Sequence, residues 1–230
     1  MAAIVLLSGG LDSTVNLKQA RDEDGVALAL TFDYGQRAAA REAACARFMC
    51  QQLQVPFRLL QLPWLADICA TALVNRRVSV VEVRPEQLDQ PAVTSGETAR
   101  AVWVPNRNGV FANIAAAFAE SLSADSVVAG FNAEEAMTFP DNSPSFVAAT
   151  NACLRLSTRT GVRLLSYTQH LEKADIVRLG RRIGAPIPSI WSCYLGQAEH
   201  CGRCESCARL ERALRQAGAW EWFHSQRWLP

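Results

Sequence analysis

Short, uninterrupted apolar runs alternate with amphipathic stretches along most of the chain. The apolar runs lie at 4–7, 26–32, 56–62, 126–131 and 162–167, and stretches of helical composition lie between and after them at 12–24, 37–53, 113–122, 144–157 and 173–183. Apolar runs without polar alternation are typical of parallel strands that helices cover on both faces. We therefore predict an α/β fold with an open, parallel, five-stranded sheet and helices on both faces.

This strand–helix rhythm is interrupted twice. Between 63 and 105 apolar residues mix with prolines and glutamines, and "TSGET" stands near the end, so we expect an insertion or lid over the sheet. After Pro188 come a cysteine cluster, a charged helix and a tryptophan-rich tail, whose aromatic rings we expect to dock on the main domain. The breaks predict a main domain at 1–188 and a small helical C-terminal segment at 189–230 on the same globule.

Composition narrows the class of partner. Half of the 230 residues are hydrophobic and the formal net charge is +1, which gives no broad electrostatic reason to bind nucleic acid and favours a small-molecule substrate. No stretch approaches the roughly 20 apolar residues that a membrane span needs. The apolar opening "AAIVLL" is too short for an export signal and has no basic residue before it. We expect a cytoplasmic protein that binds neither membranes nor, stably, nucleic acid.

The cysteines form two unlike sets. Four are scattered, and we expect them to be small buried side chains. The other four, crowded near the C-terminus, are Cys193, Cys201, Cys204 and Cys207. Four thiolates at this spacing suit a tetrahedral, structural Zn²⁺ site, with an iron–sulfur cluster as the alternative. His200 is a less favoured substitute ligand.

The motif "LLSGGLDSTV" at 6–15 turns the chain from the first strand into the first helix. Such a turn lies at the carboxyl end of a parallel sheet, where its glycines, hydroxyls and the helix amides can hold an anion. It lacks the lysine of a P-loop and the spaced glycines of a dinucleotide site. Asp12 beside a phosphate implies Mg²⁺, while the plain alternative is that Asp12 or Ser13 caps the helix.

"SGGLDS" resembles the signature of the PP-loop ATP pyrophosphatases, which cleave ATP between the α and β phosphates. The resemblance implies an adenine nucleotide alpha hydrolase-like fold, a loop that holds pyrophosphate, and Lys173 reaching the phosphates. A lysine at a helix start is as often a solvated surface charge. The implied nucleotide contacts are Leu7, Ser8, Gly9, Gly10, Leu11, Asp12, Ser13, Thr14, Phe32, Asp33 and Tyr34.

Further motifs narrow this resemblance. "FDYGQR", "VPNRN", "FPD" and "WSCY…HCGRCESC" resemble the 7-cyano-7-deazaguanine synthase family from Ile4 to about Gly218. The family resemblance implies a ligase, leaning towards a homodimer, that adenylates 7-carboxy-7-deazaguanine, takes up ammonia to form an amide, and adenylates that amide to reach the nitrile. The chain departs from the family at "FPDNS", where the family form is Tyr-Pro-Asp-Cys-Arg, which leaves room for a different carboxylate substrate.

Candidate roles follow from this chemistry. A carboxylate can accept the two donors of a guanine-like edge, and an arginine can bind the substrate carboxylate or a phosphate. The acidic candidates also fit an exposed loop, and Asn108 also fits a turn residue. The implied catalytic residues are Ser8, Asp12, Ser13, Arg107 and Lys173. The implied substrate residues are Arg107, Asn108, Glu134, Glu135, Phe139 and Asp141.

Two other functions remain open at this point. A tRNA thiolase of the PP-loop class would be expected to carry an extra RNA-binding domain and a reactive cysteine. A zinc-ribbon interaction module on a degenerate nucleotide-binding core would be expected to have lost the glycine turn, which is intact here.

Overall fold

A five-stranded, all-parallel sheet forms the centre of the computed structural model, which describes residues 2–88 and 100–230. The strand order is β3-β2-β1-β4-β5. The bounds are β1 Ala3–Leu6, β2 Val26–Asp33, β3 Phe57–Gln61, β4 Ser126–Val128 and β5 Arg163–Leu165. Each neighbouring pair is parallel, as the uninterrupted apolar runs predict.

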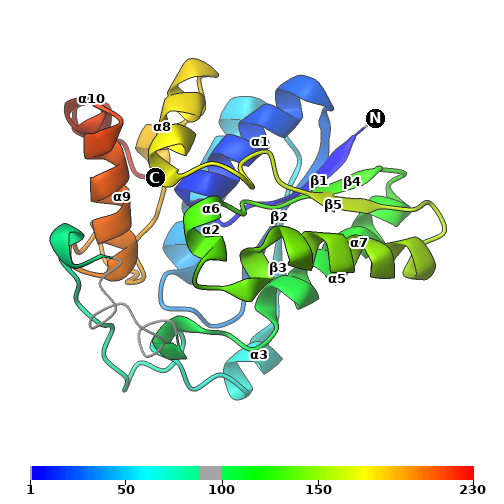
Figure 1. The fold of residues 1–230 in the computed structure, drawn as a ribbon, viewed down its shortest axis with the longest axis horizontal. Coiled ribbons are helices and arrows are strands. Elements are labelled where there is room, and N and C mark those ends of the chain that lie inside the picture. Colours follow the sequence, from blue (N-terminus) through cyan, green and yellow to red (C-terminus); the bar gives the residue numbers. More distant parts are fainter. Residues whose placement is uncertain (1, 89–99) are drawn as a thin grey trace.

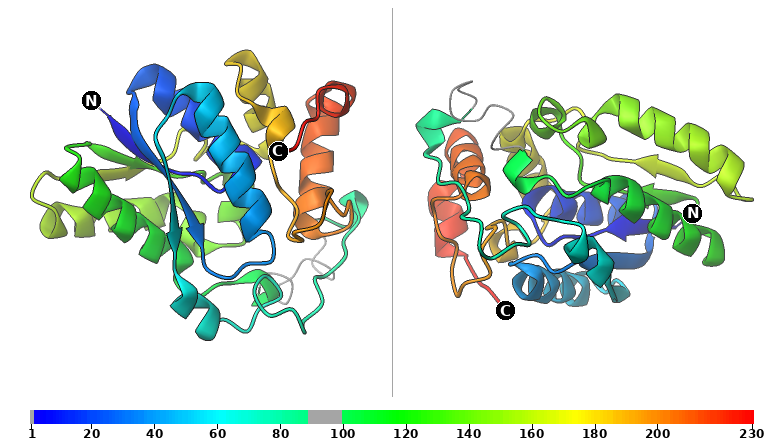
Figure 2. Two further views of the ribbon diagram at one scale, coloured as in Figure 1. Left: turned by 180° about the vertical axis from the view of Figure 1, so that it is seen from behind. Right: turned by 90° about the horizontal axis from the view of Figure 1, so that it is seen from below.

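Helices cover both faces of this sheet (Figure 1). On one face lie α1 Leu11–Glu23, α2 Ala39–Leu53 and α8 Lys173–Arg182, and on the other α5 Arg107–Ser121 and α7 Pro144–Ser157. The C-terminal helices are α9 Glu205–Gln216 and α10 Trp220–Ser225, and α9 packs beside α8 (Figure 2). The short elements are α3 Pro63–Asp67, α6 Ala133–Ala136, and the 3-10 turns η1 Pro85–Gln87, η2 Pro140–Asn142 and η3 Ile187–Ser189.

Successive residues of the central strand enter two different cores. Ala3 and Val5 pack in the core that α1, α2, α8 and α9 share, while Ile4 packs in the core beneath α5 and α7. All three side chains are fully buried, so neither face of β1 tolerates a polar residue. Among the described residues, no helix is long and apolar enough to span a membrane.

Several predicted boundaries shift in the structure. α5 begins at Arg107, six residues before the predicted start at Asn113, because Asn106 with φ 49° turns the chain directly into the helix. β4 ends earlier than its apolar run, because Ala129, Gly130 and Phe131 leave the sheet to line a cavity. β5 ends at Leu165, two residues before the end of its apolar run.

The expected insertion at 63–105 contains α3 and η1 and extends from the sheet edge to the C-terminal helices. Glu82 pairs with Cys204 in an isolated antiparallel bridge, and Val83 and Leu88 pack against Ala208 of α9. Residues 89–99, including "TSGET", lie outside the described part of the chain.

A buried asparagine joins α1 to the segment that precedes α8. Asn16 Nδ2 donates to Thr168 Oγ1 at 2.7 Å, and Asn16 Oδ1 accepts from the Tyr167 amide at 2.8 Å. Because the Asn16 side chain is fully buried, these bonds fix how the start of α8 lies against the start of α1.

The expected docking of the aromatic tail is confirmed. Trp220 and Trp222 pack against the core that α9 joins, and the Trp228 ring lies 4.1 Å from the Phe48 ring on α2. The tail is therefore part of the packed structure rather than a free surface for bases.

Gly9 and Gly184 allow a matched test of backbone strain. Both have positive φ, but a Cβ at Gly9 would lie 2.8 Å from the Glu42 carbonyl oxygen, whereas a Cβ at Gly184 meets nothing within 4 Å. We expect Gly184→Ala to lower the free energy of unfolding by about 1 kcal/mol and Gly9→Ala by about 3 kcal/mol, because only Gly9 adds a collision to the strain. Urea unfolding measures both, and equal losses would contradict the predicted collision.

Candidate functional site

A cavity of about 280 Å³ opens at the carboxyl ends of the central strands. Its walls include the glycine turn after β1, the end of β2, the residues around the start of α5, the segment 129–142, and the segment 191–210. Glu42 of α2 and Lys173 of α8 also line it. This is the position at which open parallel sheets bind ligands.

The glycine turn forms the floor of the cavity. Ser8 Oγ and Ser13 Oγ lie 3.0 Å apart, and Ser13 Oγ also donates to the Gly10 carbonyl oxygen at 3.2 Å. The N-cap of α1 is Gly10 and no side chain caps the helix, so the capping alternative for Asp12 and Ser13 is wrong. The first amides of α1 therefore remain available to an anion.

A buried lysine lies between two carboxylates beside this turn. Lys173 Nζ is 2.8 Å from Asp12 Oδ2 and 2.7 Å from Glu135 Oε1. Burial alone would lower the pKa of Lys173, but the charges of Asp12 and Glu135 outweigh burial and raise it. The alternative of a solvated lysine is therefore wrong, because the Lys173 side chain is only 10% exposed.

The carboxylates of Asp12 and Glu135 differ in the direction in which their pKa is shifted. Burial raises the pKa of Asp12 against the opposing attraction of Lys173. Burial would also raise the pKa of Glu135, but the charge and hydrogen bond of Lys173, together with Arg209 and Asn132, outweigh it and lower the pKa. Asp12 Oδ1 is buried and has no hydrogen-bond partner among the described residues. An oxygen in this state has a free lone pair to offer a cation.

Glu134 points away from the cavity although it is adjacent to Glu135. Glu134 Oε1 accepts the Lys173 amide at 2.9 Å, and Glu134 Oε2 lies 2.8 Å from the Arg212 guanidinium on α9. Both glutamates are therefore ion-paired, and the alternative of an exposed acidic loop is wrong.

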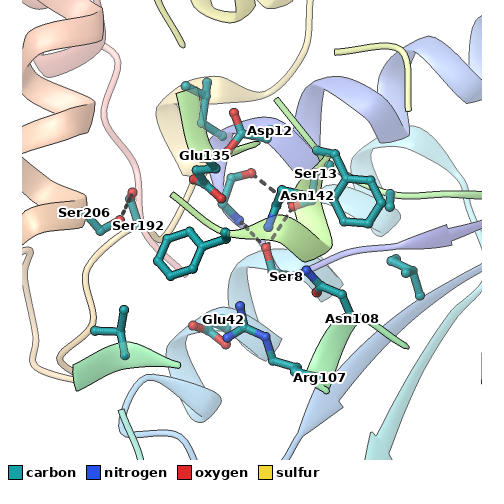
Figure 3. A pocket seen from close by; sticks show the side chains of 18 of the residues that line it. Ser8, Asp12, Ser13, Glu42, Arg107, Asn108, Glu135, Asn142, Ser192 and Ser206 are labelled. Atoms are coloured by element: carbon teal, nitrogen blue, oxygen red, sulfur yellow. Dashed lines mark hydrogen bonds between the residues drawn. The ribbon is translucent and has the colours of Figure 1, made fainter. Parts of the chain in front are cut away.

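Arg107 lies at the opposite wall of the cavity. Its Nη1 donates to Tyr34 Oη at 3.1 Å, and Figure 3 shows its guanidinium near Glu42 of α2. Burial raises the pKa of Glu42 to about 7, while the hydrogen bond from Gln36 and the charge of Arg107 oppose the rise. This wall therefore has a fixed positive charge beside a carboxyl group that titrates near neutral pH.

Aromatic rings line the region between these two walls. Phe32 and Phe111 stack with centroids 4.1 Å apart, and Tyr34 lies 5.8 Å from Phe111. Farther along, Phe139 and Trp103 lie with centroids 6.2 Å apart. Flat apolar surfaces of this kind suit a planar heterocycle.

Asp141 lies in the 3-10 turn η2, which directly follows Phe139. Asn108 Nδ2 donates to the Asp141 carbonyl oxygen at 3.3 Å, which joins η2 to the first turn of α5. Burial raises the pKa of Asp141, and the positive charge of Arg107 opposes this rise.

Most of the residues predicted from the sequence line this one cavity. They are Leu7, Ser8, Gly10, Leu11, Asp12, Ser13, Phe32, Tyr34, Arg107, Asn108, Glu135, Phe139, Asp141 and Lys173. Gly9, Thr14, Asp33 and Glu134 are not among its lining residues. Asp33 Oδ1 instead accepts the Gly35 amide at 3.0 Å, and Thr14 Oγ1 donates to the Gly10 carbonyl oxygen at 2.6 Å.

The sequence analysis missed Glu42, Trp103, Tyr194, Glu205 and Arg209, which also line the cavity. Tyr194 and Trp103 stand within or next to quoted motifs, so position in the sequence was an available signal. Glu205 also stands within a quoted motif, "HCGRCESC". Glu42 and Arg209 lie outside the quoted motifs, and nothing local sets them apart.

The C-terminal cysteines gather at one point behind the last wall. The Sγ atoms of Cys193, Cys201, Cys204 and Cys207 all lie within 4.8 Å of one another, and those of Cys201 and Cys207 are 3.9 Å apart. Four sulfurs at about 2.3 Å from one tetrahedral ion would be about 3.8 Å apart, so the cluster fits a single metal ion. His200 is not in this group, since its Nε2 accepts the Ser192 amide at 3.3 Å.

This cluster positions the wall that α9 supplies. Cys204 is the N-cap of α9, and Glu205 directly after it pairs with Arg209 at 2.8 Å. Ser192 Oγ and Ser206 Oγ, on either side of the cluster, lie 2.9 Å apart at the cavity (Figure 3). A metal held behind α9 would therefore fix several cavity side chains.

Comparison with known proteins identifies relatives of this chain. The family description "Queuosine biosynthesis protein QueC" matches residues 2–218. The 7-cyano-7-deazaguanine synthases of Desulforamulus reducens and Desulforudis audaxviator are 54% and 52% identical over 95% of this chain, covering 95% and 98% of those proteins.

Among solved structures, NMN synthetase from Francisella tularensis is 16% identical with a TM-score of 0.46, over 100% of this chain and 87% of that one, which is too weak a likeness to support an inference. The match to the family and the identity to its members suffice without it. The chain belongs to the QueC family of queuosine biosynthesis, enzymes of the PP-loop class whose members above are 7-cyano-7-deazaguanine synthases.

Proposed function

We propose that this chain is an ATP-dependent ligase that converts 7-carboxy-7-deazaguanine and ammonia to 7-cyano-7-deazaguanine. The family membership supports this assignment, and one structural observation carries it. The same cavity contains an anion-binding turn with a buried lysine and, farther in, flat aromatic walls with an arginine. The phosphates of ATP and a planar heterocyclic acid could therefore bind in adjoining parts of this cavity.

The proposed reaction uses two molecules of ATP. The substrate carboxylate attacks the α-phosphorus of the first, giving an acyl adenylate and pyrophosphate. Ammonia then attacks the acyl carbon and releases AMP, which leaves the amide. The amide oxygen is adenylated by the second ATP, and loss of AMP and a proton from nitrogen gives the nitrile. Both carboxylate oxygens thus leave on AMP, and no water enters.

The chain's own residues stabilise the departing pyrophosphate. The amides at the start of α1 and the hydroxyls of Ser8 and Ser13 would donate to its oxygens. Lys173 would supply the positive charge that these donors lack, from a place that Asp12 and Glu135 already fix.

The unpartnered Asp12 Oδ1 fits a divalent cation in this arrangement. We therefore assign Asp12 as the residue that would hold Mg²⁺ carried by ATP. The ion would supply neutralisation of phosphate charge. Glu135 would instead keep Lys173 in place, since it accepts that ammonium at 2.7 Å.

The substrate would lie between the glycine turn and α5. Arg107 would bind the substrate carboxylate or the α-phosphate. Asn108 would hold η2 in place through its hydrogen bond to the Asp141 carbonyl oxygen. Phe139 and Asp141, which line the cavity, would contact the base. Glu134 would act at a distance, because its carboxylate binds the Lys173 amide and Arg212.

We further propose that the four-cysteine cluster binds Zn²⁺ in a structural role. Four thiolates complete the coordination shell, so no position remains for substrate or water. Such an ion would hold the segment 189–230 as an appendage on the domain 1–188. That the enzyme is a cytoplasmic homodimer remains a prediction.

The first prediction concerns the reaction itself. Purified protein with ATP, Mg²⁺, ammonia and 7-carboxy-7-deazaguanine should form the nitrile, with two AMP released per product, as measured by mass spectrometry. A parallel reaction with benzoate in place of the deazaguanine acid is the control for unspecific adenylation. Consumption of ATP with another acid, and none with this one, would refute the assignment.

Asp12→Asn tests the charged cluster. We expect turnover to fall about 100-fold or more, because the substitution removes the cation ligand but keeps the side-chain shape. Asp22→Asn is the matched control, since Asp22 forms surface ion pairs with Lys18 and Arg21 on the same helix and does not line the cavity. If Asp12→Asn retains the turnover of Asp22→Asn, Asp12 has no part in catalysis.

Cys204→Ser tests the metal site. We expect zinc content, measured by plasma mass spectrometry, to fall from one ion per chain towards none, together with a lower melting temperature. Cys50→Ser removes a buried thiol of α2 outside the cluster and should leave zinc content unchanged. A zinc-free Cys204→Ser protein as stable as Cys50→Ser would contradict the structural role.

A further inference from the structure

Two aromatic rings face the cavity from different parts of the chain. Trp103 precedes α5 and Phe139 follows α6, and both line the cavity with partly exposed side chains. Their planes are within 13° of parallel and their centroids are 6.2 Å apart. The stack of Phe32 and Phe111 in the same cavity is equally parallel but closed, with centroids at 4.1 Å.

The wider spacing matters because of the thickness of a heterocycle. A base held between two rings needs about 7 Å from ring to ring, twice the contact distance of about 3.5 Å. Because their centroids are 6.2 Å apart, the planes of Trp103 and Phe139 are at most that far apart, and the rings must separate by about 1 Å or more to admit a base. Neither ring belongs to the buried core, and an outward movement of the Trp103 ring would admit a base.

The carboxylates around the cavity differ in what already binds them. Lysine or arginine side chains pair with Asp12, Glu135 and Glu205. Asp141 has no ion pair among the described residues, and its Oδ1 accepts one hydrogen bond, from Asn142 Nδ2 at 3.3 Å. Glu42 also has no ion pair among the described residues, but its Oε2 accepts from Gln36 Nε2 at 2.8 Å. Asp141 stands two residues from Phe139, so we take its carboxylate, rather than that of Glu42, as the acceptor for a base held at that ring.

Phe139 is also linked to the charged cluster. Its amide donates to the Glu135 carbonyl oxygen at 2.7 Å, and the Glu135 carboxylate holds Lys173. One turn of chain therefore separates the phosphate end of the cavity from the ring. This separation suits a single nucleobase-sized substrate whose reacting group lies against the α-phosphate.

We propose that Trp103 and Phe139 hold the 7-deazaguanine ring of the substrate between them, and that Asp141 accepts its ring N–H and exocyclic amine. The proposal rests on the function proposed above and names how that site recognises its base. Stacking supplies affinity for any purine-like ring, and the carboxylate selects the guanine-type edge. Trp103, near the end of the segment 63–105, is thus a substrate-binding residue, and Asp141 is the residue that determines specificity.

The test compares Trp103→Ala with Trp103→Phe and with Trp64→Ala. Trp64 lies on α3, is 46% exposed and does not line the cavity. We expect Trp103→Ala to raise the KM for 7-carboxy-7-deazaguanine about tenfold or more, since a stacked ring contributes about that much to affinity. The KM for ATP should change less than about twofold, and Trp103→Phe should restore most of the affinity because it keeps a ring.

Binding without turnover gives a second readout. Calorimetric titration of 7-carboxy-7-deazaguanine without ATP should show the same loss for Trp103→Ala, and the acid should quench tryptophan fluorescence in the wild type but not in Trp103→Phe. Asp141→Asn should weaken the binding of 7-carboxy-7-deazaguanine. It should leave unchanged the binding of 7-deazaadenine-type analogues, which lack the paired donors.

The outcomes separate the two proposals. If the wild type forms the nitrile while Trp103→Ala keeps its KM and its calorimetric affinity, the aromatic site is wrong and the function stands. If the wild type binds the acid with loss of affinity in Trp103→Ala yet forms no nitrile, the base site stands and the function is wrong.

Discussion

The ammonium group of Lys173 is held by one carboxylate from α1 and one from α6. A charge buried to this degree is costly unless it is paired, and removing one partner from such a pair typically costs about 3–5 kcal/mol. The glycine turn, the short helix α6 and the start of α8 therefore cannot move independently. Asn16 adds a second bond between α1 and the segment that leads to α8. The floor of the cavity is in this way rigid before any ligand enters.

The wall of the cavity that α9 supplies depends on a different constraint, the four cysteines of the C-terminal cluster. They fix the start of α9, and α9 in turn carries Arg212 to Glu134, the neighbour of Glu135. A change in the position of the cysteines would thus act through the ion pair of Arg212 and Glu134, and Glu134 is adjacent to Glu135, whose carboxylate holds Lys173. Lys173 Nζ lies 2.8 Å from Asp12 Oδ2 although the two residues are 161 positions apart, so segments far apart in the sequence complete one site.

The sheet and the glycine turn were predictable because their signals are local. Strands buried on both faces must be apolar throughout, and a turn with Gly9 at φ +76° must be glycine there. The two adjacent glutamates were not separable, because only the tertiary packing sends Glu134 to α9 and Glu135 to Lys173. Glu42 was missed for the same reason, since its burial arises when α2 packs against the turn and leaves no mark in the helix sequence.

The segment 133–142 decides where a substrate can lie. One end is fixed by the ion pairs of Glu134 and Glu135, and the other by the bond from Asn108 to the Asp141 carbonyl oxygen. Phe139 stands between these two fixed ends, so its ring has little freedom to approach or leave the phosphate floor. The distance between the proposed phosphate-binding and ring-binding parts is therefore set by backbone structure rather than by side-chain choice. If the substrate binds as proposed, a longer or shorter acid would lose contact at one end, and this geometric limit acts in addition to any hydrogen bond to the base.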